Sequence, residues 1–315
     1  MGIQAKAEVK FALIEQALSE PSNLLTITEL CSIAGVSRSG FYRWQTASPM
    51  REAREEQDRE DFARILEAYQ FRGYAKGARS IHMRLLHQDI LMNLKKIRRL
   101  MRKFHLICPI RRINPYKQMA RDMRTNMTAP NVLNREFLLH GPRKVLLTDI
   151  TYLFYRGGHH CYLSTILDAF TREILSYQIS ESLEVRFVIE TVAQLLEVHG
   201  AVLDNETIVH SDQGCHYTSR AFIEALQDAN FIQSMSAKGV CWDNAPQESF
   251  FGHMKDEIAD EISKCSSFAA VKETVDDWMD YYNNDRYQWD MLKLSPKEYY
   301  TYTQTGVYPL MKFKP

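Results

Sequence analysis

Three acidic residues, Asp149, Asp212 and Glu248, lie in sequence contexts where an isolated surface charge is hard to explain. Asp212 and Glu248 are separated by 35 residues, and Asp149 lies far upstream of both. Carboxylates are hard oxygen ligands, so three of them brought together can hold divalent cations such as Mg²⁺. Paired Mg²⁺ ions held this way can activate an attacking oxygen and stabilise the leaving oxygen of a phosphodiester. The acids therefore point to metal-dependent phosphoryl transfer, provided that the fold brings them together.

The first two acids fall on predicted strands. Residues 145–155 are rich in β-branched, aromatic and aliphatic side chains, which predicts a strand buried on both faces around Asp149. A buried Asp needs a partner, so it is either a metal ligand or a hydrogen-bonded or salt-bridged core residue. Asp212 follows the short apolar strand 207–211 and opens into a loop, a place where open α/β sheets bind ligands. Its alternative role is a helix cap, although Ser219 competes for that role.

The third acid falls on a predicted helix over residues 245–260, with Pro246 in the first turn. Lys255 follows Glu248 by seven residues, or two helical turns, so both side chains project from one side of the helix. This pair is either a plain surface ion pair or a metal ligand beside a phosphate clamp. The spacing alone does not decide between the two.

In combination, the motifs around these acids resemble the DDE transposases of bacterial insertion sequences, specifically the IS-three family, and more distantly the retroviral integrases. The similarity covers nearly the whole chain and is weakest before about residue 25. The matching segments are residues 148–152 for the first acid, 210–214 and 217–219 for the second, 236–245 and 248–250 for the third, and 281–283, 286 and 294–296 for a C-terminal signature.

The resemblance implies an α/β fold: a ribonuclease-H-like catalytic core, with a mixed five-stranded sheet flanked by helices, preceded by all-α helix-turn-helix modules. In such a core the three acids meet at one end of the sheet. The residue pattern independently predicts strands at 145–155, 161–169, 173–180, 207–211 and 231–235, and helices at 184–198 and 219–229. The predicted domains are a helix-turn-helix DNA-binding unit (1–50), a second helical DNA-binding module (51–108), a basic linker (109–143), the catalytic core (144–262) and a C-terminal helical extension (263–315).

The formal net charge of zero conceals two halves of opposite sign. Residues 1–144 carry 26 Lys and Arg against 14 Asp and Glu, and residues 145–315 carry 13 against 25. A basic half predicts contact with nucleic acid. The six cysteines are widely spaced and include no CxxC pair, which disfavours a zinc ribbon and predicts reduced thiols. No apolar run approaches 18 residues, so we expect an intracellular protein without membrane association. The resemblance implies a bacterial, cytoplasmic, nucleoid-associated protein.

The basic half contains two candidate DNA-binding elements. Residues 26–44 have a helix-turn-helix outline, in which Ser37 caps a second helix that carries Arg38 and Arg43. Its first helix is predicted to bury one face. That face consists of Ile27, Leu30, Ile33 and Ala34.

Residues 95–103 form the second candidate, with an apolar stripe and six cations on the other faces. No acid lies among these cations, which favours phosphate contact over a merely solvated face. The cations are Lys95, Lys96, Arg98, Arg99, Arg102 and Lys103, and the Pro-rich linker that follows adds Arg111 and Arg112.

The resemblance implies a DNA transposase that cleaves insertion-sequence ends and joins the 3′-OH to another phosphodiester, in copy-out, paste-in transposition. It implies two Mg²⁺ (or Mn²⁺) ions per active site, held by the three acids, and double-stranded DNA partners, namely terminal inverted repeats and target. His210, Lys238, Asn244 and Lys255 are expected to line the DNA path. The alternative is a non-catalytic DNA-binding regulator with a ribonuclease-H-like domain.

We expect a homo-oligomer on DNA, because two ends must be synapsed. The predicted helix 267–282 has a broad apolar face that could serve packing or a protomer interface, and packing on the core is favoured.

Overall fold

The computed structural model describes residues 5–109, 140–236 and 244–310. The chain divides into two compact units, Met1–Arg64 and Ile65–Pro315, with the division inside helix α4 (Ser48–Gln70). Arg111, Arg112, Lys238 and most of the predicted basic linker lie outside the described residues. No helix in the described ranges is long and apolar enough for a bilayer crossing.

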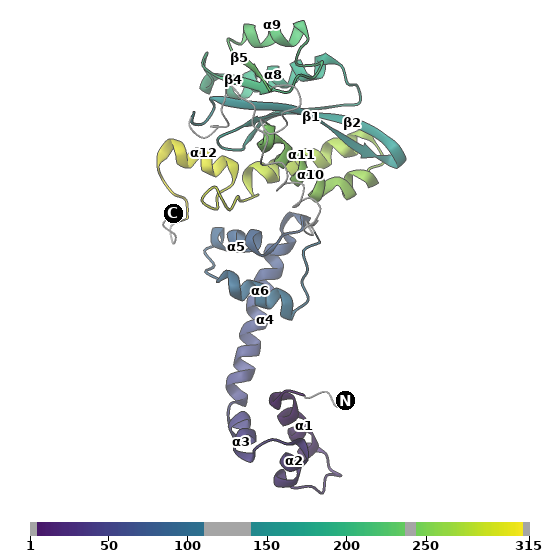
Figure 1. Ribbon diagram of the computed structural model, residues 1–315, viewed down its shortest axis with the longest axis vertical. Helices are drawn as coiled ribbons and strands as arrows, with labels where there is room; N and C mark the ends of the chain where they lie inside the picture. The colour runs from purple at the N-terminus through teal and green to yellow at the C-terminus, as the bar shows by residue number, and fades with distance from the viewer. Residues whose placement is uncertain (1–4, 110–139, 237–243, 311–315) are drawn as a thin grey trace, which may run out of the picture. The chain divides into compact units, whose positions relative to one another are not determined.

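The first unit begins with three helices, α1 (Ala7–Ser19), α2 (Ile27–Ala34) and α3 (Arg38–Thr46), as Figure 1 shows. They pack around a small hydrophobic core. The predicted turn between α2 and α3 is confirmed, because Gly35 adopts the left-handed conformation with φ 63° and the Ser37 side chain accepts a hydrogen bond from the Gly40 amide. Arg38 and Arg43 are exposed on α3. The core consists of Phe11, Ile14, Cys31 and Phe41.

One prediction for this unit is wrong. The sequence pattern assigns Ile33 to the buried face of α2, but its side chain is 73% exposed. Cys31 takes the buried position instead, because residues 27, 30, 31 and 34 share one face of an α-helix and residue 33 does not. Helix α1, which supplies Phe11 and Ile14, is absent from the sequence-based predictions.

The second unit starts with the end of α4 and continues through α5 (Ala78–His87) and α6 (Leu94–Lys103). Helix α6 is amphipathic, with Ile97, Leu100 and Met101 buried on one side. Its opposite sides carry the six cations, of which four are exposed and two are half-buried. The exposed ones are Lys95, Arg98, Arg99 and Arg102, and the half-buried ones are Lys96 and Lys103.

The predicted fold is confirmed: the described residues contain a mixed five-stranded sheet in the order β3-β2-β1-β4-β5, the ribonuclease-H-like arrangement. Strands β1 to β3 form an antiparallel meander, whereas β4 and β5 run parallel to β1. The strands are β1 (Val145–Tyr155), β2 (His159–Asp168), β3 (Ile174–Ser180), β4 (Ile208–Ser211) and β5 (Ile232–Met235).

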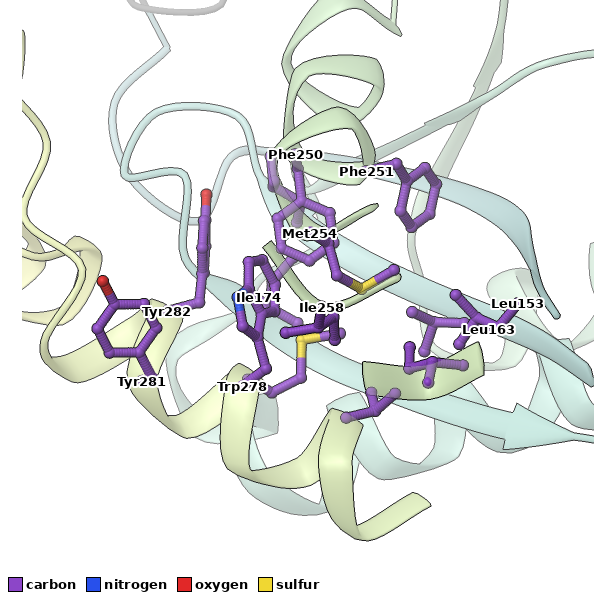
Figure 2. Packing of buried hydrophobic residues seen from close by; sticks show 14 of the residues in the cluster. Leu153, Leu163, Ile174, Phe250, Phe251, Met254, Ile258, Trp278, Tyr281 and Tyr282 are labelled. Carbon is purple, nitrogen blue, oxygen red and sulfur yellow. The ribbon is translucent and has the colours of Figure 1, made fainter. Parts of the chain in front are cut away.

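Helices cover both faces of this sheet, as Figure 1 shows. On one face lie α8 (Val185–His199) and α9 (Arg220–Asp228), and on the other lie α10 (Ala245–Lys264) and α11 (Phe268–Asn284). Helix α12 (Pro296–Thr305) packs on α11. Two hydrophobic clusters separate these layers, and the larger contains the apolar side of α10 (Figure 2).

The apolar face predicted for residues 267–282 packs on the catalytic core, the option that the sequence favours. Trp278 and Tyr282 on α11 contact Phe250 on α10, with ring centroids 5.5 and 4.8 Å away (Figure 2). Offset and edge-to-face aromatic pairs of this kind add to the stabilisation from burial. This packing holds α10 against the sheet.

The prediction that β1 is buried on both faces holds only for its first half. Tyr152 is 47% exposed and Phe154 is 63% exposed. The alternating residues Leu153 and Tyr155, which face the other side, are buried. The reason is that β1 pairs with β4 only over residues 145–147, and the rest projects with β2 as a hairpin covered on one side.

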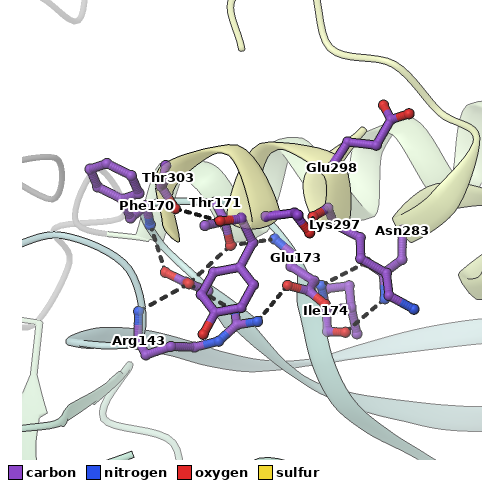
Figure 3. Close-up of polar contacts among 12 residues, drawn as sticks. Arg143, Phe170, Thr171, Glu173, Ile174, Asn283, Lys297, Glu298 and Thr303 are labelled. Atoms are coloured by element: carbon purple, nitrogen blue, oxygen red, sulfur yellow. Dashed lines mark hydrogen bonds and ion pairs between the residues drawn. The ribbon is translucent and has the colours of Figure 1, made fainter. Parts of the chain in front are cut away.

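The C-terminal signature locks α10 and α11 to the sheet. Asn283 accepts a hydrogen bond from the Ile174 amide at 3.0 Å and donates one to the Ile174 carbonyl at 2.8 Å, which fixes the start of β3 (Figure 3). Arg286 donates three hydrogen bonds to the Glu257 carboxylate of α10, at 2.8, 3.0 and 3.3 Å. Because this charge pair is largely buried, it holds α10 in a defined position relative to the turn after α11.

The helical module of the second unit is attached to the same region by ion pairs. Arg72 contacts Asp277, Asp280 and Asp285, and Arg84 contacts Asp285 at 3.5 Å. The module carrying α5 and α6 is therefore joined to α11 and the segment after it.

A buried ion-pair cluster ties the start of β1 to the turn between β2 and β3 (Figure 3). The Arg143 guanidinium contacts Asp168 at 2.9 Å and Glu173 at 2.6 Å, and it stacks over the Tyr300 ring at 3.9 Å. Asp168 also accepts hydrogen bonds from the Phe170 amide and the Thr171 hydroxyl. A buried polar cluster with this many internal bonds specifies one arrangement of the strand ends.

Replacement of Arg143 by Leu is expected to lower the free energy of unfolding by about 3–5 kcal/mol, because two buried carboxylates lose their counter-charge. Chemical denaturation would measure the loss. Lys144→Ala is the matched control, since Lys144 pairs with exposed Asp204 and Glu206 and should contribute little. Equal stability of both variants would contradict a structural role for the cluster.

Candidate active site

Asp149 lies on the α10 side of the sheet. Alternate residues of a strand face the same side, and Leu147 and Leu153 of β1 are buried in the cluster that contains α10. Asp149 is partly buried there, and its carboxylate accepts a hydrogen bond from the Ile150 amide at 2.8 Å. Asp168 of β2, by contrast, accepts bonds from the backbone and from a guanidinium group. Asp149 therefore differs from a charge-paired core acid.

Asp212 lies beside Asp149 by strand register. β1 and β4 run parallel with Leu147 opposite His210, so each acid follows this pair by two residues along the chain. Neighbouring strands lie about 4.8 Å apart, which brings the two carboxylates to the same edge.

The loop after β4 holds the Asp212 side chain. Asp212 accepts a hydrogen bond from the Gly214 amide at 2.8 Å, and a Cβ on Gly214 would come within 2.8 Å of the same carboxylate oxygen. Ser219 caps α9 by accepting from the Phe222 amide, so the alternative role of Asp212 as a helix cap is excluded.

Glu248 lies in the first turn of α10, which has Pro246 near its start as predicted. The helix extends to Lys264, beyond the predicted end at residue 260. The apolar residues Phe250, Phe251, Met254 and Ile258 bury the other side of α10. Glu248 and Lys255 therefore lie on the exposed side, near the strand that carries Asp149.

Electrostatics shows that these groups are close together. Burial, together with the negative charges of Asp212 and Glu248, raises the pKa of Asp149 to about 7, against the lowering effects of the Ile150 amide hydrogen bond and of Lys255. Burial lowers the pKa of Lys255, and the charge of Asp149 opposes this shift. The three acids and the lysine thus form one coupled electrostatic group.

The carboxylates are near one another without being drawn into a tight cluster. Across the described ranges, no group of three or more His, Cys, Asp and Glu side chains has the spacing of a metal site. Like charges repel, so carboxylates approach ligand distances only when a cation compensates them. The donor set, three hard oxygen ligands, fits Mg²⁺ or Mn²⁺.

Two other predicted site residues are buried. His210 on β4 is fully buried, with Nδ1 3.0 Å from the Ser234 hydroxyl of β5. Asn244 immediately precedes α10 and is 7% exposed. Neither offers surface to DNA in this arrangement, because both side chains are enclosed by the protein.

Sequence reasoning missed two residues beside the acids, Gln247 and Thr165. Gln247 precedes Glu248 and is fully buried, and its amide donates a hydrogen bond to the hydroxyl of buried Thr165 on β2. The available signal is a polar side chain three residues before the apolar pair Phe250 and Phe251, at a helical spacing that places it on their side of the helix.

Comparison with known proteins agrees with this fold. Family models described as integrase core domain match residues 140–241 and 248–303, and one described as HTH-like domain matches residues 56–113. The putative transposase InsK for insertion sequence element IS150 of Escherichia coli (strain K12) is 32% identical over 286 residues, covering 90% of this chain and 96% of that protein. The chain belongs to the insertion-sequence transposases of the IS-three family.

Another member of the transposase family, transposase InsF for insertion sequence IS3A of Escherichia coli (strain K12), is 26% identical over 86% of this chain and 93% of its own. Among solved structures, the HTLV-2 integrase catalytic core domain in complex with magnesium is 14% identical and covers 50% of this chain and 97% of its own, at a TM-score of 0.39. A likeness this low carries no weight for function.

Without divalent ions, Asp149→Asn is expected to be more stable than the wild-type transposase at pH 8, by about 1–3 kcal/mol after allowance for solvent screening. The folded-state pKa of about 7 lies above the ordinary value of 3.8, so ionisation of Asp149 destabilises the fold between these two values. The advantage should therefore grow from pH 4 to pH 7 and then stay constant. Unfolding followed from pH 4 to 8 measures it.

Asp228→Asn, an exposed change on α9, is the control and should show no such trend. An Asp149→Asn variant no more stable than wild type at pH 8 would contradict the electrostatic coupling.

Proposed function

We propose that this transposase is a divalent-metal-dependent polynucleotidyl transferase that cuts next to insertion-sequence ends and joins the released 3′-OH to another phosphodiester. The observation that supports this most is the electrostatic convergence of Asp149, Asp212 and Glu248 at one edge of the sheet. Membership of the transposase family supplies the class of reaction. The movement we propose is of the copy-out, paste-in type.

Asp149, Asp212 and Glu248 would hold two Mg²⁺ or Mn²⁺ ions. When bound, such ions activate the attacking oxygen and stabilise the leaving oxygen of the phosphodiester. The raised pKa of Asp149 means that its negative charge is disfavoured until positive charge arrives. This electrostatic strain favours cation binding above about pH 7, where the carboxyl is ionised.

The remaining polar groups serve to position DNA. Lys255 lies on the same side of α10 as Glu248 and within electrostatic range of Asp149, so its ammonium group can contact a phosphate beside the acids. We assign no Ser or Tyr nucleophile, because the proposed reaction needs no covalent protein intermediate. The buried Tyr217, whose hydroxyl lies 3.5 Å from that of Thr148, supports the strand beneath Asp149.

The helical elements would bind double-stranded DNA at the terminal repeats. The cationic sides of α6 and the exposed Arg38 and Arg43 of α3 provide positive surfaces, each on a helix that follows a turn. Synapsis of two ends requires at least two such proteins, so we propose a homo-oligomer on DNA. A purely regulatory role is disfavoured, because DNA binding alone gives no use for three acids whose mutual repulsion raises the pKa of Asp149.

Asp149→Asn, Asp212→Asn and Glu248→Gln are each expected to reduce strand cleavage and joining by at least about 100-fold, because each removes a charged oxygen ligand. Binding to end-containing DNA should remain within about 3-fold of wild type, since the proposed contacts of α3 and α6 with phosphates are unchanged. Gel assays with Mg²⁺ and end-containing DNA measure both quantities.

Asp260→Asn, an exposed carboxylate change on α10, is the matched control and should leave cleavage unchanged. Joining at the wild-type rate by any of the three variants would remove the proposed mechanism.

Arg98→Ala and Arg102→Ala on α6 are expected to weaken DNA binding and to reduce the slope of log affinity against log salt by about 0.9 for each phosphate that is no longer neutralised. Both side chains are exposed on the cationic side of the helix. Fluorescence anisotropy across a salt series measures the slope. Lys272→Ala, an exposed cation on α11, is the control, and an unchanged slope in both Arg variants would exclude α6 from the DNA interface.

A further inference from the structure

A fully buried amide occupies the first turn of the helix that carries Glu248. Gln247 has no exposed surface, although its neighbours Ala245 and Glu248 are exposed. Burying an amide destabilises a fold unless hydrogen bonds replace its water contacts. The position of Gln247 therefore needs a reason beyond packing.

The hydrogen bond of Gln247 reaches the residue that lies directly opposite Asp149 on the neighbouring strand. Its Nε2 donates to the Thr165 hydroxyl, and Thr165 is the antiparallel register partner of Asp149. Directly opposed residues of an antiparallel pair have Cβ atoms about 4.5–5.5 Å apart on the same face. The bond thus links the residue before one acid to the residue beside another.

A contribution to the stability of the fold does not by itself explain this hydrogen bond. The Gln247 Oε1 atom is buried with no hydrogen-bond partner among the described residues, and Thr165 is fully buried. An apolar side chain of similar volume would fill the space without leaving a buried carbonyl unsatisfied. What the amide adds is a directional contact, which an apolar side chain lacks.

We propose that Gln247 is a positioning residue, which sets the start of α10 relative to β1 and β2 so that Glu248 and Asp149 reach the same cation. This role rests on the proposed metal-dependent function. Thr165, which accepts the hydrogen bond from Gln247, would have the same positioning role on β2. Helix α10 is also held further along, by Phe250 in the hydrophobic cluster and by the Glu257–Arg286 pair. The hydrogen bond from Gln247 adds a contact within its first turn.

The test is Mn²⁺ binding to the full chain, titrated by electron paramagnetic resonance, with thermal unfolding measured in parallel. Thr165→Val keeps the shape of the side chain and removes the hydroxyl, so Mn²⁺ affinity should fall by about 10–100-fold, the range for residues that orient metal ligands. Thr165→Ser keeps the hydroxyl and should stay within about 3-fold of wild type.

Gln247→Met provides a second variant, which leaves Thr165 unchanged. It removes the amide and its unsatisfied carbonyl, so it should melt at or above the wild-type temperature while binding Mn²⁺ about 10–100-fold more weakly. Weaker binding by a protein that is equally or more stable separates positioning from folding.

Ser164→Ala is the matched control, because Ser164 precedes Thr165 on β2, faces the other side, and accepts a hydrogen bond from Thr191 at 3.0 Å. It should lose stability without losing Mn²⁺ affinity. If wild type bound no Mn²⁺, the proposed function would fail together with this role. If wild type bound Mn²⁺ and Thr165→Val and Gln247→Met bound it equally well, only the positioning role would be overturned.

Discussion

The fold of the second unit must hold three carboxylates close together although they repel one another. The consequence is visible at Asp149, whose pKa rises to about 7 through burial and the charges of Asp212 and Glu248. Opposing this repulsion is a large hydrophobic cluster in which α10 and α11 pack against the sheet. Hydrophobic burial therefore maintains an arrangement that the chain's own charges oppose, as is common where a site is built for a ligand.

Helix α10 both packs in the hydrophobic core and carries one of the three acids, and different sides of the helix do each. Its buried side joins the core, and its exposed side carries Glu248 and Lys255. The family's C-terminal signature acts on this helix at a distance, since Arg286 binds Glu257, which also accepts a hydrogen bond from the Trp278 ring at 3.0 Å. Residues of the signature that lie far from the acids in sequence thus help to determine where Glu248 lies.

The elements that carry the acids could be predicted from the sequence, because their strands are strongly apolar and the third acid lies on a periodic helix. Element ends shifted by only a few residues. The exposed side of the β1–β2 hairpin could not be predicted, since the exposure of Tyr152 and Phe154 depends on how far β4 extends beside them. The prediction for Ile33 failed because residue 33 lies off the helix face that residues 27, 30, 31 and 34 share, which helical periodicity alone could have shown. The spacing of Gln247 could have placed it on the buried side of α10, but its relation to Asp149 could not be predicted. Its partner Thr165 is 82 residues away, and only the register of β1 and β2 shows that relation.

The ion pairs of Arg72 and Arg84 with Asp277, Asp280 and Asp285 have a consequence for where a DNA strand would be cut. They attach the helical module that contains α6 to the segment that follows α11. Arg286 in that segment forms an ion pair with Glu257 of α10, the helix that carries Glu248. If α6 binds a terminal repeat, the folded protein between α6 and the three acids would determine how many base pairs separate the bound DNA sequence from the cleaved phosphodiester. A change in the length of the peptide between the module and the core would then leave the cut site where it is.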